Sequence, residues 1–248
     1  MNDRRRISYK IYYRLLVAEL IKLNYYNERV HQLIKLPKIE NELFKLRCFV
    51  KNGDVCIDVG ANVGMYSIML SRICGKNGTV LSFEPTPEVF HYLSKIIRNG
   101  INKLSNVKLY QMALGNHTGN VSLIFQNEKN GEISDTLTRI GEDQGAVRMT
   151  TLDAVVKKLE LREVNFIKID VEGYELKVLK GSVELLQKYH PILLMEIDNM
   201  WLARYGSSYE EILSFLSSLG YKQVILEECS FRIASRKYMG NVYFKWFE

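Results

Sequence analysis

An apolar segment, Val55–Val59, leads directly into a loop that contains Gly60 and Gly64. A second apolar segment, residues 80–83, ends at Glu84. Doubly wound α/β folds bind adenosine cofactors with this layout: a buried strand, a glycine turn that opens a helix, and an acid ending the next strand. Glycine allows the backbone to turn sharply and to approach a ligand closely. This part of the chain therefore predicts a nucleoside site in which Glu84 accepts hydrogen bonds from the ribose hydroxyls.

The spacing of the glycines separates one class of cofactor from another. Dinucleotide sites use a G-x-G-x-x-G loop, because a pyrophosphate must sit on backbone N–H groups at a helix N-terminus. This loop reads G-x-x-x-G, and an acid precedes it. A carboxylate there suits a ligand with an ammonium group and no phosphate, such as S-adenosylmethionine (SAM). Taken alone, this glycine loop is as typical of an ordinary strand-to-helix turn as it is of a cofactor-binding loop. The predicted cofactor residues here are Asp58, Gly60, Asn62, Gly64 and Glu84.

A second signature lies far along the chain, at Phe166-Ile-Lys-Ile-Asp-Val-Glu-Gly-Tyr-Glu175. With residues 58–64 and Thr151-Leu-Asp153, it resembles the FkbM family of SAM-dependent methyltransferases over residues 53–198. The resemblance implies a Rossmann-like class I methyltransferase sheet of seven strands, with the last pair antiparallel and helices on both faces. It also implies methyl transfer to a hydroxyl group of a sugar or a polyketide-like natural product.

The alternation of apolar and amphipathic segments indicates an α/β sheet independently of the resemblance. Apolar runs predict buried strands at residues 55–59, 80–83, 107–112, 166–169 and 192–197, and two last strands at residues 222–226 and 242–246. Helices are expected between them, at residues 64–74, 87–99, 152–159, 174–188 and 209–219. An extra strand is expected at residues 121–125, and the polar segment 126–144 is interpreted as a mobile loop over the substrate.

The excess of positive charge lies outside the predicted catalytic domain. Residues 1–51 hold 12 Lys and Arg against 5 Asp and Glu, whereas residues 52–248 hold 22 against 23. An enzyme acting on nucleic acid is expected to carry basic residues around its cleft, so this distribution disfavours a nucleic-acid partner. A chain of this length can bury one good core, so we expect one folded domain with an appended segment. Residues 1–51 form a basic helical segment, and residues 52–248 form the methyltransferase domain.

The basic segment is predicted to contain an amphipathic helix. Its apolar face carries Tyr9, Tyr13, Leu16, Leu20 and Leu23. This helix either packs against the domain or against a second subunit in a homo-oligomer, or rests on an anionic membrane surface; the remaining alternative is a disordered arm. Charged residues interrupt the apolar runs there, which disfavours a signal peptide and a membrane span.

The cysteines and the absence of a predicted signal peptide bear on localisation. Cys48, Cys56, Cys74 and Cys229 form no C-x-x-C pair, and we interpret them as reduced thiols. We therefore expect a cytoplasmic protein, with peripheral contact at the inner membrane face as the alternative.

Ligands of open α/β sheets collect at the carboxyl ends of the strands. Four acids fall there: Asp58, Glu84, Asp170 and Asp198. Asp170 and Glu172 project to the same side of an extended chain, and we predict that they hold and deprotonate the acceptor hydroxyl. Asp170 is the stronger base candidate, and Glu172 alternatively caps the helix that follows. The four histidines are interpreted as non-catalytic, and Tyr174 stands where the family frequently has His.

Two further predictions concern adenine and a metal ion. Many methyltransferases place an acid for adenine after the third strand, but this chain has Met112 and Ala113 there, so we expect apolar and backbone contacts. Asp170, Asp198 and Asn199 are similar in kind and location to the magnesium ligands of catechol-type O-methyltransferases, and oxygen ligands suit Mg²⁺. Asp-Asn is also a common turn pair, so both interpretations stay open.

The sequence thus predicts a SAM-dependent O-methyltransferase acting on a hydroxyl of a sugar, glycan or related natural product. The alternatives are a methyltransferase acting on nucleic acid or protein, and a non-catalytic SAM-binding module. The lack of an Asn-Pro-Pro-Tyr-like motif after the fourth strand disfavours methylation of amino groups. Trp201 and Tyr205 either stack on the acceptor's sugar ring or fill the core.

Overall fold

The structure is a computed structural model that describes residues 43, 45–62, 64–99, 104–127, 133–141 and 145–248. The predicted N-terminal helix, with its membrane or subunit contact, lies outside the described residues. None of the described helices combines the length and apolar character that a membrane crossing requires.

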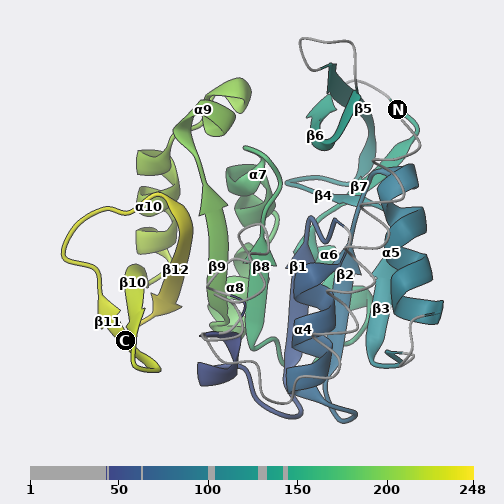
Figure 1. Ribbon diagram of the computed structural model, residues 1–248. Helices are drawn as coiled ribbons and strands as arrows, with labels where there is room; N and C mark the ends of the chain where they lie inside the picture. Colours follow the sequence, from purple (N-terminus) through teal and green to yellow (C-terminus); the bar gives the residue numbers. More distant parts are fainter. Residues whose placement is uncertain (1–42, 44, 63, 100–103, 128–132, 142–144) are drawn as a thin grey trace, which may run out of the picture.

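An eight-stranded sheet forms the centre of the molecule (Figure 1). Its strand order is β11-β10-β12-β9-β8-β1-β2-β3. The strands are β1 (Val55–Val59), β2 (Thr79–Phe83), β3 (Val107–Tyr110), β8 (Phe166–Ile169), β9 (Ile192–Ile197), β10 (Tyr221–Glu227), β11 (Ser230–Ile233) and β12 (Gly240–Trp246). Neighbouring strands from β9 to β3 are parallel, whereas β12 runs antiparallel to both β9 and β10. The seven predicted strands and the antiparallel last pair are confirmed. The edge strand β11 was not predicted.

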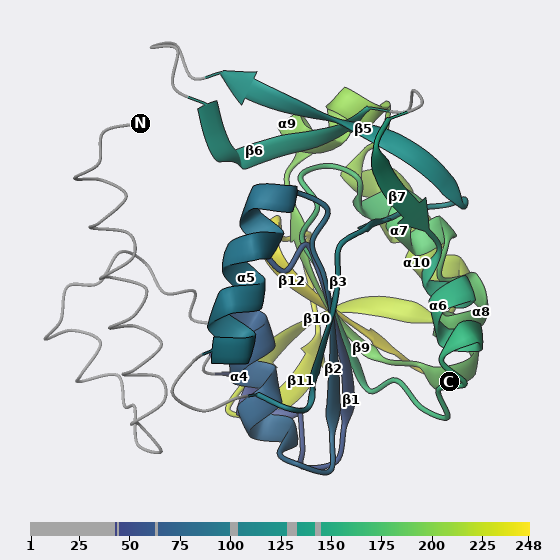
Figure 2. The same ribbon diagram turned by 90° about the vertical axis from the view of Figure 1, so that its right-hand side faces the viewer.

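Helices cover both faces of this sheet (Figure 2). On one face lie α4 (Met65–Cys74) and α5 (Pro87–Asn99). On the other lie α6 (Leu152–Lys158), α7 (Glu175–Lys180), α8 (Val183–Tyr189) and α10 (Tyr209–Ser218). Because both faces are covered, the parallel strands are mostly apolar, and β8 is buried along its whole length, Lys168 included. The prediction of one helix at residues 174–188 is wrong: α7 ends at Gly181, where a Cβ would overlap the carbonyl oxygen of Gly115.

A second, four-stranded sheet lies above the carboxyl ends of the parallel strands (Figures 1 and 2). Its order is β4-β7-β5-β6, formed by β4 (Ala113–Leu114), β7 (Val147–Thr150), β5 (Gly119–Asn127) and β6 (Ile133–Gly141). The prediction of a loop at residues 126–144 is wrong for residues 133–141, which pair with β5 as an antiparallel hairpin. An antiparallel sheet with one solvated face accepts polar residues, so polarity did not separate this hairpin from a loop.

The core extends to residues that precede the predicted domain boundary. Leu43, Leu46 and Val50 are buried in a cluster with Cys56 of β1 and Leu70 of α4. A short 3₁₀ helix, η1 (Leu46–Cys48), carries part of this segment. The last residues of the predicted N-terminal part therefore contribute to the packing of the sheet.

The prediction of four reduced cysteines is wrong for two of them. Cys48 and Cys229 form a disulfide with a Cα–Cα distance of 4.8 Å. They lie 181 residues apart in sequence, and no local motif pairs them, because only the fold brings η1 to the turn between β10 and β11. Cys56 and Cys74 are free and buried, with their sulfur atoms 3.4 Å apart.

Reduction of this disulfide is expected to lower the free energy of unfolding by about 2 kcal/mol. The cross-link restricts the unfolded chain, but Cys229 lies in an exposed turn of an edge hairpin, so we place the effect at the low end of the usual range. Denaturant titration with and without a phosphine reductant measures it. Cys229→Ser is the control, since its stability should not respond to the reductant. Four titratable thiols in the denatured, unreduced protein would contradict the assignment.

Candidate active site

A pocket lies at the carboxyl ends of β1, β2 and β8, and seven of the predicted site residues line it. Its lining includes Gly60, Asn62, Glu84, Met112 and Ala113 from the predicted cofactor set, and Asp170 and Glu172 from the predicted catalytic pair. Leu123 of β5 and Ile140 of β6 also line it. The enclosed volume is about 80 Å³, whereas ligand pockets commonly measure roughly 300–1,000 Å³.

The glycine loop passes tightly between two strand ends. Gly60 has a φ of +76°, and a Cβ there would overlap the carbonyl oxygen of Asp170. Its N–H donates to the carbonyl of Phe83 at 3.0 Å, which fixes the loop against β2. Gly64, at a φ of +93°, stands at the N-cap position of α4. The predicted strand–turn–helix arrangement is present, and the close approach at Gly60 requires a residue without a side chain.

Glu84 is held at the rim of the pocket by two backbone groups. One carboxylate oxygen accepts from the N–H of Asn62 and the other from the N–H of Thr86, each at 2.9 Å. The residue is 6% exposed, and this burial raises the pKa of the carboxyl above its ordinary value, although the backbone bonds oppose the shift. Each oxygen of a carboxylate can accept a second bond, so Glu84 retains capacity for ribose hydroxyls.

Asp58 does not line the pocket, although it was predicted to bind the cofactor. Its side chain is fully buried and accepts from Ser67 of α4 at 2.6 Å, while the second oxygen has no hydrogen-bond partner. Burial raises the pKa of this carboxyl, and the charge of Lys168 on the neighbouring strand opposes the shift. The structure thus places Asp58 beneath the glycine loop.

Asp170 is held by Lys168, at 2.7 Å between Nζ and the carboxylate. Although burial disfavours its charged form, the positive charge of Lys168 and hydrogen bonds lower the pKa of Asp170 below its ordinary value. The register pairs Ile169 with Met195 in the parallel strands β8 and β9. The next residues along the two strands, Asp170 and Glu196, are therefore neighbours, and Glu196 contributes a hydrogen bond to Asp170.

Glu172 differs from Asp170 in the direction of its pKa shift. Burial, followed by the charge of Asp170, raises the pKa of Glu172 to about 8, and Arg204 opposes the shift. One of its carboxyl oxygens is buried without a hydrogen-bond partner. The N-cap of α7 is Tyr174, so the alternative that Glu172 caps this helix is wrong. The sequence predicted Asp170 as the stronger base, whereas in the structure the pKa of Asp170 is lowered and that of Glu172 is raised.

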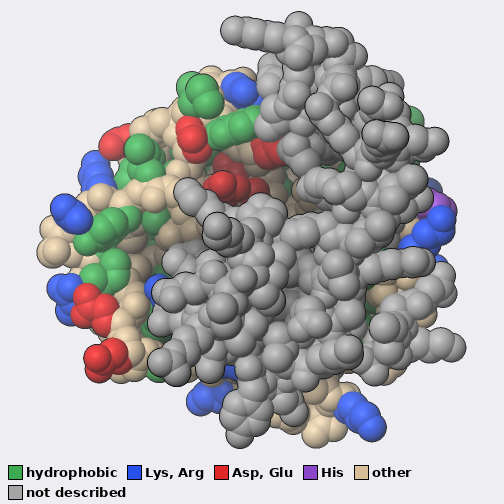
Figure 3. All heavy atoms as spheres, viewed as in Figure 1, with side chains coloured by type: hydrophobic (Ala, Val, Ile, Leu, Met, Phe, Trp, Pro, Cys, Tyr) green, Lys and Arg blue, Asp and Glu red, His purple; other side chains and the backbone are tan. Residues whose placement is uncertain are grey.

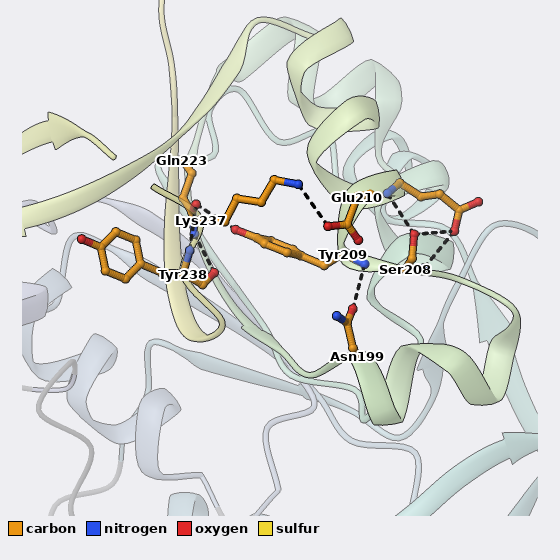
Figure 4. Close-up of polar contacts among 8 residues, drawn as sticks. Asn199, Ser208, Tyr209, Glu210, Gln223, Lys237 and Tyr238 are labelled. Carbon is orange, nitrogen blue, oxygen red and sulfur yellow. Dashed lines mark hydrogen bonds and ion pairs between the residues drawn. The ribbon is translucent and has the colours of Figure 1, made fainter. Parts of the chain in front are cut away.

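Two of the three predicted metal ligands, Asp198 and Asn199, accept hydrogen bonds from backbone N–H groups. Asp198 lies two residues beyond Glu196 and caps the short helix α9 (Asn199–Leu202) by accepting from Met200 N–H at 2.7 Å. The side-chain oxygen of Asn199 accepts from the N–H of Tyr209, at the start of α10 (Figure 4). Within the described residues, no group of three acidic, His or Cys side chains is arranged to hold a metal ion.

Trp201 and Tyr205, the candidates for stacking on a sugar ring, and two of the histidines make the following contacts. The Tyr205 hydroxyl, on η2 (Ala203–Tyr205), accepts from Ile140 N–H at 2.8 Å, and its ring packs edge-on against Tyr174. The guanidinium of Arg204 lies over the ring of Trp201, 3.9 Å from the ring centroid. His190 stacks on Trp246 at the far end of the sheet from the pocket, and His117 is exposed in a turn. His31 lies outside the described residues.

A family model described as the methyltransferase FkbM domain matches residues 58–223, well over half of the chain. The chain belongs to the FkbM methyltransferase family. The match spans the glycine loop, Glu84 and the Asp170–Glu175 signature, so the predicted resemblance is confirmed.

Relatives of this FkbM methyltransferase include the hexuronic acid methyltransferase AglP of Haloferax volcanii, at 26% identity over 172 residues that cover 67% of each protein. An FkbM methyltransferase structure from Methylobacillus flagellatus KT aligns at 17% identity with a TM-score of 0.48. That alignment covers 78% of this chain and only 43% of the other. A protein described as an rRNA-methylase of Clostridium thermocellum aligns at 14% identity with a TM-score of 0.50, over 86% of this chain and 99% of that one. This last likeness shows the shared α/β methyltransferase fold alone.

Three charged residues of the FkbM methyltransferase site were not predicted. Glu196 adjoins Asp170 through strand register, and Arg204 is the positive charge that acts on Glu172. On the face viewed in Figure 3, acidic side chains gather near the upper end of the sheet, where β8 and β9 end. Glu175 is buried below the pocket. Only the register of β9 beside β8 could have indicated Glu196, whereas Glu175 was visible as the last residue of the signature.

Proposed function

We propose that this FkbM methyltransferase transfers a methyl group from SAM to a hydroxyl group of a sugar. The observation that carries the proposal is the pairing of two differently tuned carboxyls in one pocket. Glu84 is an acceptor oriented by backbone N–H groups, and Glu172 is a carboxyl of raised pKa. The first fits a ribose, and the second fits removal of the hydroxyl proton.

The residues present suit a cofactor that is a nucleoside with a positive charge. Gly60 and Asn62 of the glycine loop line the pocket, and apolar Met112 and Ala113 are available there for adenine. Asp170, kept ionised by Lys168, supplies negative charge near that loop. When bound, SAM supplies an electrophilic methyl group on its sulfonium sulfur.

The chain's own residues then position the acceptor and take its proton. Holding a hydroxyl oxygen in line with the methyl carbon provides much of the rate, because reaction between bound groups avoids the entropy cost of an encounter. An alcohol is a poor nucleophile while protonated, so a nearby base is required. The carboxylate of Glu172 would take the proton of the acceptor hydroxyl, Asp170 would stay ionised, and the methyl group would leave the sulfonium sulfur, releasing S-adenosylhomocysteine.

A sugar acceptor is favoured by the relative that is named as a hexuronic acid methyltransferase. The near-neutral charge of residues 52–248 supports a small or glycan acceptor over nucleic acid.

The proposal is tested with SAM labelled by ¹³C in its methyl group and a panel of hexoses and hexuronic acids, free and as glycosides. We expect a labelled product that survives treatment with alkali, because a methyl ether is stable there and a methyl ester is not. An alkali-labile product would place the methyl group on a carboxyl and contradict hydroxyl transfer. A labelled RNA or protein in a parallel reaction, with no labelled sugar, would favour the alternative acceptors.

A further inference from the structure

Glu175 is a buried acid that the proposed chemistry does not use. It lies in the first turn of α7 and is 2% exposed. A carboxyl is costly to bury unless hydrogen bonds compensate it. Burial raises the pKa of Glu175 to about 7, with backbone bonds opposing the shift and the charge of Asp170 adding to it. Glu175 is therefore a costly acid beside Val171, a residue that lines the pocket.

Glu175 accepts hydrogen bonds from the backbone. One carboxyl oxygen accepts two backbone N–H groups, those of Val171 and Gly173, each at 3.1 Å. These two residues flank Glu172 on either side. The bonds therefore clamp the backbone of Glu172, while the side chain of Glu172 makes none of them.

The clamped backbone has a conformation that a glutamate rarely adopts. Glu172 has a φ of +53°, in the left-handed region that a Cβ disfavours. Gly173 follows at +103°, and a Cβ there would overlap the backbone carbonyl of Trp201. Such a turn persists only when its surroundings hold it. An extended backbone, which the sequence suggested, would give Glu172 a different direction.

We propose that Glu175 is a positioning residue, whose carboxyl holds the Val171–Gly173 backbone in the left-handed turn that keeps Glu172 in the pocket. The inference rests on the proposed function, in which Glu172 takes the proton of the acceptor. Without the clamp, the turn relaxes toward an ordinary conformation, and the Glu172 carboxyl leaves its desolvated position among the other acids.

The position of Glu172 is measurable through its titration, because its neighbours come from several elements. Three acids raise the pKa of Glu172: Asp170 after β8, Glu196 in β9 and Glu84 after β2. Arg204 of η2 lowers the pKa of Glu172. A carboxyl that leaves this surrounding loses both the burial and the acidic neighbours, so its pKa falls toward the ordinary value.

The test compares Glu175→Leu with Glu175→Gln in full-length protein. Leu removes the acceptor, whereas Gln keeps a side-chain oxygen in the place that receives both N–H groups. In protein carrying ¹³C-labelled glutamate carboxyls, the Glu172 signal is assigned by its absence in Glu172→Gln. We expect it to titrate near 8 in wild type and Glu175→Gln, and at least one pH unit lower in Glu175→Leu. With the best sugar of the panel, kcat should fall at least ten-fold in Glu175→Leu, with KM for SAM within three-fold.

A folded Glu175→Leu whose Glu172 titrates as in wild type would overturn the inference. If Glu175→Leu does not fold, Glu175→Asp is the second variant, because its shorter side chain keeps the charge but does not reach both N–H groups. It should displace the Glu172 titration in the same direction, and an unchanged titration would again overturn the clamp. Failure of the wild type to bind SAM or to methylate any sugar would instead contradict the proposed function, since the titration needs neither.

Discussion

Glu172→Gln is expected to lower kcat by a factor of roughly 10²–10⁴, the usual contribution of a positioned general base. Gln has nearly the same shape as Glu and keeps hydrogen-bonding capacity, but it cannot accept a proton. The structure singles out Glu172 because its carboxyl is desolvated, lies beside other acids and has an oxygen without a partner. Steady-state kinetics with SAM and the best sugar acceptor measure the change, and the affinity for SAM should stay within a few-fold.

The pH dependence gives the same prediction a second readout. A base must be ionised to act, and the pKa of Glu172 is raised to about 8. The value of kcat/KM for SAM, which reports on the free enzyme, should therefore rise with pH, reach half of its maximum near 8 and level off above it. In Glu172→Gln this rise should be absent. Bound SAM, being positive, favours the ionised carboxyl, so the midpoint in kcat should lie below that in kcat/KM.

A matched control is available in the same chain. Glu160 also has a positive φ, of +50°, but it is exposed at the end of α6 and does not line the pocket. Glu160→Gln should leave both turnover and its pH dependence unchanged. A rise near pH 8 that survives in Glu172→Gln and disappears in Asp170→Asn would assign the proton transfer to Asp170 instead.

The opposite pKa shifts of Asp170 and Glu172 show the limit of what the sequence could indicate. Both acids line the pocket at the end of β8, and the sequence indicated this because a buried parallel strand ends in a recognisable way and ligands collect at that end. Their relative basicity was not accessible, because it depends on groups that the fold assembles. Lys168 pairs with Asp170, and Glu196 comes from another strand. The left-handed backbone at Glu172 also sets the direction of its side chain. Glutamate rarely adopts this conformation, so its residue type did not indicate that direction.

The fold itself was largely predictable, for a related reason. Strands buried on both faces are continuous apolar runs, and the glycine loop marks where the first of them turns into a helix. The missed features depend on distant partners. Strand β6 is defined by pairing with β5, and the Cys48–Cys229 disulfide by the approach of η1 to the β10–β11 turn. Local sequence carries little information about either.

Glu84→Ala is expected to weaken SAM binding by roughly 100-fold or more. A hydrogen bond to a charged group contributes about 1.5–3 kcal/mol, and two ribose hydroxyls bound by one carboxylate make two such bonds. Their loss corresponds to about 3 kcal/mol or more, or two powers of ten in Kd. The mutation also removes the acceptor for the N–H of Asn62, so the glycine loop loses a contact that orients it. Calorimetric titration of SAM into wild type and mutant measures both Kd values.

Two variants separate these contributions. Glu84→Gln keeps one oxygen acceptor and removes the charge, so its Kd should lie between those of wild type and Glu84→Ala. Glu88→Ala changes an exposed acid in the first turn of α5, only four residues away, and should bind SAM as wild type does. NAD, whose pyrophosphate needs a different glycine loop, should not bind to any of the three variants. If SAM bound to Glu84→Ala as tightly as to wild type, Glu84 would not contact the ribose. The pocket at the ends of β1 and β2 would then need a different ligand, even though the chain has the fold and family of a methyltransferase.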